Sequence, residues 1–468
     1  MNGSSLQPTK PRRQLTVFDA TCIIVGIIIG SGIFRTPSIV AGSLGDPWLI
    51  IGAWLLGGLL ALIGALCYAE LTTTYPRQGG DYVYLSRAYG PRTGFLFAWA
   101  EFWIIRPGST GPMAFVFGQY AHQLYPLGTG NDVLCYAVGS IVMITLLNAA
   151  GMRSGKWTQN VLTTIKVLAL LAIFVAALLA TPANNVALVE GSTFPPLAAI
   201  SFAMLMVMFT FGGWNDMAFV SAEVRDPNRN LVRSLVIGTS LVTLVYVLVN
   251  LAYLRVLGVA GLAGTTTPAT SLMQKTAGDP GGQMASALIC ISALGAINGM
   301  IFTGARVYHA LGEQLPTFRW LAHWNNRVNA PVRSIVLQSV VILAVVVGFG
   351  SLNSPGNEKV KDFEAFEQLV IFGAPCFWLF LLLVGISLFV LRHKDSHLPR
   401  SFRVPFYPVL PAIFCLGCLF MVYSTVPFMI QQLSNPAMLA KPAFLAILIS
   451  TGIIILAGAL LAWLKVSD

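Results

Sequence analysis

Long apolar runs alternate with short polar segments along almost the whole chain. A helix that crosses a membrane needs about 20 mostly apolar residues, and the sequence contains about twelve such runs. They cover residues 17–40, 47–74, 94–123, 132–151, 158–181, 197–222, 231–258, 283–312, 332–350, 366–391, 406–427 and 437–464. The pattern predicts an all-α membrane protein with twelve transmembrane helices.

The polar segments between these runs are mostly short, so no soluble domain is expected between neighbouring helices. Segment 75–93 predicts a surface or re-entrant helix with a break at Gly79-Gly80. Segment 351–365 carries charges of both signs and predicts a solvated outer loop.

Composition supports a membrane protein over a soluble one. Of the 468 residues, 56% are hydrophobic and 10% are charged, whereas soluble domains carry about 25% charged residues. The seven cysteines lie within apolar runs, where Cys behaves as a small hydrophobe. The five histidines lie in loops or at the ends of runs and form no HExxH motif. We therefore expect no enzymatic activity, no cofactor and no metal site.

The net charge of +10 is distributed between the two sides of the membrane and does not form a basic patch for nucleic acid. Twenty of the 28 Lys and Arg residues lie on the side of the N-terminal tail, and five lie on the other side. This bias predicts that both termini are cytoplasmic. We expect a multi-pass protein of the plasma (inner) membrane without a nucleic-acid partner.

Glycines interrupt two of the predicted spans. Gly26, Gly30 and Gly32 lie in the first span, the last two flanking Ser31, and Gly212-Gly213 lie within the sixth. Gly is disfavoured inside helices, although small residues also allow close helix packing. Interrupted helices at corresponding positions of two halves indicate the binding site of a transporter.

This correspondence predicts two five-helix repeats of opposite orientation. The expected organisation is a cytoplasmic tail (1–14), a first repeat (15–181), a second repeat (197–391) and two additional helices (406–464). An unwound helix offers free N–H groups to an anion and free carbonyls to a cation. One site with both is suited to a zwitterion, and an amino acid is the obvious candidate.

The chain resembles the amino acid–polyamine–organocation (APC) superfamily of permeases and is most similar to its L-type amino-acid transporter branch. The resemblance runs over at least residues 15–330 and rests on separated motifs. These are Ile29–Phe34, Gly64–Leu71, Gly79–Tyr82, Ile104–Pro107, Phe209–Asn215, and Asp226-Pro227 followed by Asn230-Leu231.

The resemblance implies two inverted repeats plus two helices, and sodium-independent transport of neutral amino acids, often by exchange. The substrate carboxylate would meet the Ser31 hydroxyl and the amides of Ser31, Gly32 and Ile33. The amino group would meet carbonyls at Ile28, Phe209, Thr210 and Gly212. Phe209 would be an aromatic gate that closes over the substrate. The implied substrate-binding residues are Ile28, Gly30, Ser31, Gly32, Ile33, Phe209, Thr210 and Gly212.

Lys166 lies about 8 residues into the fifth span, roughly 12 Å along a helix. A charged residue at this depth is a functional candidate. The resemblance implies that its ammonium replaces the sodium ion of coupled relatives and bonds carbonyls of the first helix. The alternative is that the side chain extends to the membrane surface.

Three further charges lie in the spans. Glu101 and Arg106 are five residues apart, a spacing that is poor for a direct pair on one face of an α-helix. Arg106-Pro107 fits the branch pattern and is expected to fix helix geometry or a gate. Asp216 departs from that pattern, so it is a candidate partner for a cation or a carrier of a coupling proton.

Two alternatives to sodium-independent exchange of neutral amino acids stay open at this point. One is proton-coupled amino-acid symport, and the other is transport of a polyamine or other cationic amine, which would need carboxylates facing the cavity. The external cysteine by which the branch links to a heavy chain has no counterpart in 122–132, and Cys135 lies in a span. A disulfide-linked heavy chain is therefore not expected.

Overall fold

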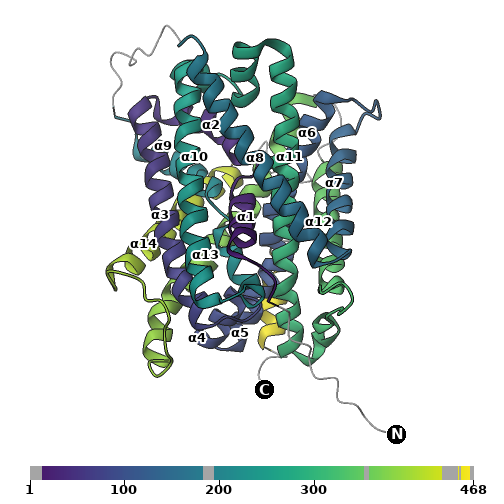
Figure 1. Cartoon of the computed structure of the whole chain (residues 1–468), viewed down its shortest axis with the longest axis vertical. Helices are drawn as coiled ribbons and strands as arrows, with labels where there is room; N and C mark the ends of the chain where they lie inside the picture. The colour runs from purple at the N-terminus through teal and green to yellow at the C-terminus, as the bar shows by residue number, and fades with distance from the viewer. Residues whose placement is uncertain (1–12, 183–193, 353–357, 435–451, 453–454, 464–468) are drawn as a thin grey trace.

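The computed structural model describes residues 13–182, 194–352, 358–434, 452 and 455–463. In these residues all regular secondary structure is helical apart from two isolated β-bridges. The long helices run roughly side by side in one upright bundle (Figure 1). Among the described residues, eight helices are long and apolar enough to cross a membrane, and two further apolar helices, Val17–Ile28 and Val409–Thr425, are shorter.

The first part of the chain forms helices with the following bounds: α1 (Val17–Ile28), α2 (Thr36–Leu44), α3 (Pro47–Thr74), α4 (Asp81–Tyr89), α5 (Pro91–Ala100), α6 (Arg106–Leu124), α7 (Asp132–Ala149) and α8 (Met152–Leu179). The second part forms α9 (Leu197–Thr210), α10 (Pro227–Ala263), α11 (Pro268–Gln314), α12 (Val332–Leu352), α13 (Glu358–Lys394) and α14 (Val409–Ser434). Short 3₁₀ segments are η1 (Gly32–Phe34), η3 (Trp214–Glu223) and η4 (Pro316–Ala322), and η2 (Glu101–Ile105) is a π-helical turn.

Both predicted interruptions are present. The α-helical part of the first span ends at Ile28, a single 3₁₀ turn follows at Gly32–Phe34, and α2 begins at Thr36. In the sixth span α9 ends at Thr210, and the chain continues as the 3₁₀ segment η3. The glycine clusters therefore break two α-helices, as the sequence predicted.

Several other boundaries differ in detail from the sequence prediction. The third span is continuous from α5 to α6 but contains the π-helical turn η2. The predicted helix in 75–93 is α4, which begins directly after Gly79 and Gly80 at φ +94° and +43°. Helix α11 begins well before the predicted residue 283, because a kink at Ala277 and Gly278 joins a short helix to the span.

The last predicted span (437–464) and the predicted tail (1–14) lie largely outside the described residues. The prediction of an outer loop at 351–365 was wrong for its described part, because α12 continues to Leu352 and α13 begins at Glu358.

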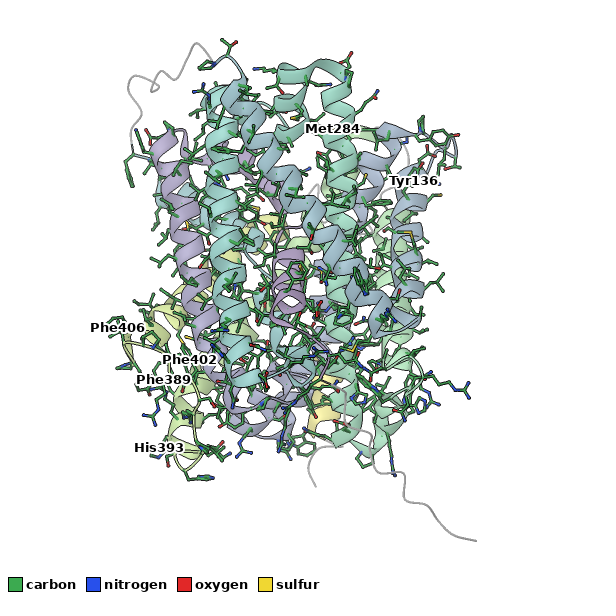
Figure 2. All side chains as sticks on the ribbon, viewed as in Figure 1. Tyr136, Met284, Phe389, His393, Phe402 and Phe406 are labelled. Carbon is green, nitrogen blue, oxygen red and sulfur yellow. The ribbon has the colours of Figure 1, made fainter. Side chains whose placement is uncertain are left out.

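Helix α1 lies in the middle of the bundle (Figure 1), packed against α8, α10 and α11. Its apolar side chains from Ala20 to Ile28 are buried, whereas Phe18 in its first turn is exposed. Outer helices instead carry large exposed apolar side chains, such as Leu59 on α3 at 54% and Leu168 on α8 at 61%. Figure 2 shows such side chains projecting outward along the bundle between Met284 near its upper end and His393 near its lower end. An apolar outer surface is what lipid surroundings favour.

Candidate functional site

At the first break, backbone groups lack the regular hydrogen bonds of an α-helix. Ser31 is buried, at 1% exposure. Its amide donates to the Met113 sulfur at 3.2 Å, and its hydroxyl donates to the same sulfur at 3.1 Å. A Cβ on Gly30 would lie 2.9 Å from that sulfur, and a Cβ on Gly32 would lie 2.8 Å from the Thr210 side chain. Side chains from other helices thus pack directly onto the unwound backbone.

The second break packs closely against α1 beside the first break. Gly213 has φ +111°, and a Cβ there would lie 2.4 Å from Ile27 Cγ2. Only glycine adopts this backbone conformation without strain, and only glycine allows α1 to come this close. The glycine pair therefore breaks the helix and brings the two breaks together.

Tyr246 of α10 joins the two breaks. Its hydroxyl lies within donating distance of Ile28 O, at 2.8 Å, and of Thr210 O, at 3.2 Å. These are two of the carbonyls that the resemblance assigned to the substrate amino group. A carbonyl oxygen has two lone pairs. Ile28 O also accepts from the Gly30 amide at 2.8 Å, so both of its lone pairs are engaged, whereas Thr210 O retains capacity for a second donor.

Lys166 of α8 lies behind the first break at 1% exposure. Its ammonium donates to Gly26 O at 2.9 Å, to Ile29 O at 2.8 Å and to Ser292 O at 2.9 Å. Two of these acceptors belong to the first span, as the resemblance implied, and the third lies on α11. The side chain points inward and does not extend to the membrane surface, so that alternative is wrong.

The spans carry a buried charge cluster, and here a sequence prediction was wrong. Arg106 lies 2.5 Å from Glu101 Oε1 and 2.7 Å from Asp216 Oδ2. The spacing of five residues does not prevent the first pair, because the π-helical turn η2 closes with Arg106 N–H bonding Glu101 O, so that i and i+5 fall on one face. Thr303 also donates to Asp216, at 2.7 Å. The cation that Asp216 partners is therefore Arg106 of the same chain.

Asp81 joins this cluster and was not among the predicted site residues. It is 3% exposed, and its Oδ1 has no hydrogen-bond partner among the described residues. The signal was present in the motif Gly79–Tyr82, because two glycines before a carboxylate begin the short helix α4. The sequence did not show that α4 turns this carboxylate toward the spans.

One cavity lies between the two breaks and the charge cluster. Its lining includes six predicted substrate-binding residues together with Met113 and Asn215: Ile28, Gly30, Gly32, Phe209, Thr210 and Gly212. Asp81, Glu101, Arg106 and Asp216 line the same cavity. The other two predicted substrate-binding residues, Ser31 and Ile33, are buried beside it. The cavity therefore combines unwound backbone at one part with three carboxylates and one guanidinium at another.

Phe209 and Thr210 occupy different surroundings in this cavity. Phe209 is half-buried, as a side chain at the cavity wall would be. The Thr210 hydroxyl oxygen lies within hydrogen-bond distance of Thr36 Oγ1 and of Met206 O, both at 2.9 Å. Thr210 thus ties α9 to α2 across the breaks.

Other candidate chemistry is limited. Within the part of the chain that the structure describes, no group of three or more His, Cys, Asp or Glu residues could hold a metal ion. All seven cysteines are free. Cys135 is exposed in the first turn of α7, near Thr129.

Comparison with known proteins identifies relatives over nearly the whole chain. The model of the amino acid permease family matches residues 15–462. The chain is 30% identical to the b(0,+)-type amino acid transporter 1 of Mus musculus, over 91% of this chain and 85% of the relative. It is 29% identical to the serine/threonine exchanger SteT of Bacillus subtilis, over 89% and 91%. It is 28% identical to the large neutral amino acids transporter small subunit 2 of Oryctolagus cuniculus, over 86% and 74%.

Proposed function

Because the chain belongs to the amino acid permease family, we propose that it exchanges neutral L-amino acids across the plasma (inner) membrane by alternating access, without sodium. The chain is a multi-pass membrane transporter and not an enzyme, since its family and relatives are transporters. To this family-level function the proposal adds the substrate class, the coupling mode and the membrane in which the carrier lies.

The observation that carries the proposal is the meeting of two broken helices at one cavity. Ile28, Gly30 and Gly32 line it from the first break, and Thr210 and Gly212 line it from the second. Backbone groups freed from helices at membrane depth need partners, and a zwitterion supplies both an acceptor and a donor. We assign the carboxylate to Ser31 and to the amides of the first break.

We assign the amino group to the carbonyls of Ile28, Phe209, Thr210 and Gly212. Of these, Phe209 O accepts from Gly212 N–H at 3.1 Å, so the ammonium would add a second donor there. Ile28 O has two donors, the Gly30 amide and the Tyr246 hydroxyl, so the ammonium would displace one of them. Phe209, at the cavity wall, is the proposed gate over bound substrate.

We assign sodium independence to Lys166. The carbonyls of the broken helix need a cation as partner. The Lys166 ammonium supplies it by donating to Gly26 O and Ile29 O. A fixed positive charge at this place leaves no need for an ion from solution.

The proposed topology has twelve transmembrane helices in two inverted five-helix repeats plus two helices, with both termini cytoplasmic. We also propose that the carrier works without a disulfide-linked heavy chain, because segment 122–132 contains no cysteine. Transport by this chain expressed alone, and by Cys135→Ser, would support that proposal, and a requirement for a second chain would contradict it.

The test is uptake by vesicles that contain the purified protein. Radiolabelled L-alanine, L-serine, L-threonine and L-leucine are supplied with and without internal amino acid, Na⁺ and a pH gradient. Internal amino acid should accelerate uptake, and Na⁺ should have no effect. Absence of uptake for all four substrates would overturn the proposed function.

A second candidate function is favoured by one specific observation, the excess of carboxylates in the cavity. Asp81, Glu101 and Asp216 line the cavity together with a single guanidinium, that of Arg106. Arg106 pairs with Glu101 and Asp216. A basic amine of the substrate or a coupling proton would balance the charge, because unpaired buried charge is unfavourable. Uptake of L-lysine or putrescine in the same vesicles would favour the cationic substrate, and strict dependence on an inward proton gradient would favour symport.

A further inference from the structure

The anion-binding part of the cavity is occupied by a side chain of the protein itself. Met113, on α6, places its sulfur 3.2 Å from the Ser31 amide and 3.1 Å from the Ser31 hydroxyl. Both are donors that the proposed function assigns to the substrate carboxylate. Met113 also lines the cavity, so the sulfur lies between the unwound backbone and the space that a substrate would enter.

Glycine at position 30 makes this contact possible. A Cβ there would lie 2.9 Å from the sulfur and 3.3 Å from the terminal methyl of Met113. The close approach of Met113 to the first break therefore depends on the same glycines that unwind the helix.

A thioether is a weak hydrogen-bond acceptor, whereas a carboxylate forms charge-assisted bonds that are roughly twice as strong as neutral ones. The buried Ser31 donors need an acceptor when no substrate is present, because an unsatisfied buried donor is costly. Methionine is unbranched, with three rotatable bonds, so its sulfur can leave the donors with little strain. These properties suit a group that is displaced on each binding event.

We propose that Met113 is an internal substitute for the substrate carboxylate and thereby sets the affinity of the carrier. The Met113 sulfur satisfies the Ser31 donors in the empty carrier, and the entering carboxylate displaces it. The measured affinity is then the difference between the carboxylate contact and the sulfur contact. This inference rests on the proposed function, since it requires a substrate with a carboxylate.

Two substitutions of similar size separate this role from simple packing. Met113→Leu removes the acceptor, and Met113→Gln replaces the sulfur by a stronger oxygen acceptor. A role in packing alone would shift the affinity of both variants in the same direction. Competition for the Ser31 donors shifts the two affinities in opposite directions.

Met152 offers a matched control. Its sulfur is buried and accepts from Asn329 Nδ2 at 3.1 Å, but Met152 does not line the cavity between the breaks. Met152→Leu therefore removes a comparable sulfur acceptor at a distance from the proposed substrate.

The experiment measures the KM and maximal rate of exchange in vesicles, with whichever of L-alanine, L-serine, L-threonine and L-leucine the unmodified carrier takes up fastest. Loss of one or two competing hydrogen bonds should lower the KM of Met113→Leu by about threefold to tenfold. The KM of Met113→Gln should rise by a similar factor, and Met152→Leu should keep the KM of the unmodified carrier.

A KM that rises or stays unchanged in Met113→Leu, or that moves in the same direction in both Met113 variants, would overturn the inference while leaving the proposed function intact. No exchange by the unmodified carrier with any of the four amino acids would instead overturn the proposed function, and this inference with it. A lower thermal stability of empty Met113→Leu, restored by substrate, would support the substitute role independently of transport.

Discussion

At the residue scale, Lys166 combines a structural contact with the proposed ion-substitute role. Its three ammonium hydrogens match three carbonyl acceptors, on Gly26, Ile29 and Ser292. Two of these carbonyls flank the point at which α1 loses its regular hydrogen bonds, so the ammonium holds the broken segment in place. Loss of the cation would leave Gly26 O without this donor, whereas Ile29 O would keep the Ser292 hydroxyl at 3.1 Å.

We therefore expect Lys166→Ala to reduce amino-acid uptake by more than tenfold while leaving the amount of protein in the membrane within about twofold, since an unsatisfied buried acceptor costs about 1–3 kcal/mol. Uptake and membrane abundance would be measured in the same cells. Lys156→Ala is the control, because Lys156 lies on the same helix and pairs with Asp19 at 3.2 Å near the start of α1. Full uptake by Lys166→Ala would remove its proposed role.

The residues of the site differ in how visible they are in sequence. Lys166 was predicted because a charge in an apolar run is conspicuous, and its carbonyl partners followed from the resemblance. Met113 and Tyr246 were missed, because a methionine or a tyrosine in an apolar span looks like an ordinary packing residue. Asp81 was quoted within a motif, but its direction depends on how α4 packs.

At the element scale, the two breaks were predictable and the π-helical turn was not. Glycine clusters signal an interrupted helix through backbone propensity alone. The extra residue of the π-helical turn η2 has no comparable signature in backbone propensity. It nevertheless places Glu101 and Arg106 on one face. A rule derived from regular α-helices therefore gave the wrong answer for this pair.

The second break also yields a prediction. Gly213→Ala should abolish uptake and lower thermal stability, because alanine is strained at φ +111° and its Cβ would lie 2.4 Å from Ile27 Cγ2. Gly139→Ala, within α7, is the control, since a Cβ at that position meets nothing within 4 Å. Thermal unfolding in detergent and vesicle uptake would be compared for both. Normal uptake by Gly213→Ala would show that the close approach of the breaks is dispensable.

The end of α13 is joined to α3 and α4 by a group that titrates. Asp395 accepts from Arg87 and, at 2.6 Å, from the hydroxyl of Tyr75, which follows α3. The Arg87 guanidinium is the main cause that lowers the pKa of Asp395 from 3.8 to about 2. A carboxyl whose pKa is lower in the folded state stabilises the fold above the pKa of the unfolded state, and this contribution is lost as the pH falls.

We expect thermal stability in detergent to decline as the pH is lowered from about 4 towards 2, with part of that decline due to Asp395. Asp395→Asn should be less stable than the unmodified protein at pH 6, and the difference should shrink by pH 2. Unfolding temperatures measured across this range provide the check. A difference that stays constant with pH would mean that the carboxylate does not contribute through its charge.

At the scale of the whole molecule, one residue, Glu223, joins several segments at the end of the bundle where Leu15 lies. The backbone amides of Gln14 and Leu15 donate to Glu223 O at 2.9 and 3.0 Å. The Glu223 carboxylate accepts from Arg306 at 2.9 and 3.1 Å and from Gln78 at 3.0 Å. One residue of η3 thus connects the start of the first span, α11 and the segment before α4.

The sequence predicted the all-α character, the membrane location and the order of most spans, because these follow from hydropathy summed over many residues. It did not predict the contacts around Glu223. Those contacts join residues more than 80 positions apart, and such long-range pairings leave no periodic signal in one sequence.

The proposed alternating access requires each end of the bundle to open in turn, and we expect the contacts of Glu223 to break when the Leu15 end opens. Glu223→Gln removes the charge that holds Arg306 and should favour the conformation open at the Leu15 end, since loss of one partner of a buried ion pair costs about 3–5 kcal/mol. Asn215 lines the cavity, so a thiol introduced by Asn215→Cys, in a background without the native cysteines, reports access to it. In Glu223→Gln, a membrane-impermeant maleimide added on the Leu15 side should label that thiol at least severalfold faster.

Glu313→Gln, at an exposed position near the end of α11, makes the same chemical change and should leave the labelling rate unchanged. Equal rates in the two variants would show that the contacts of Glu223 do not keep the Leu15 end closed, whereas faster labelling from the opposite side would place the gate at the other end of the bundle.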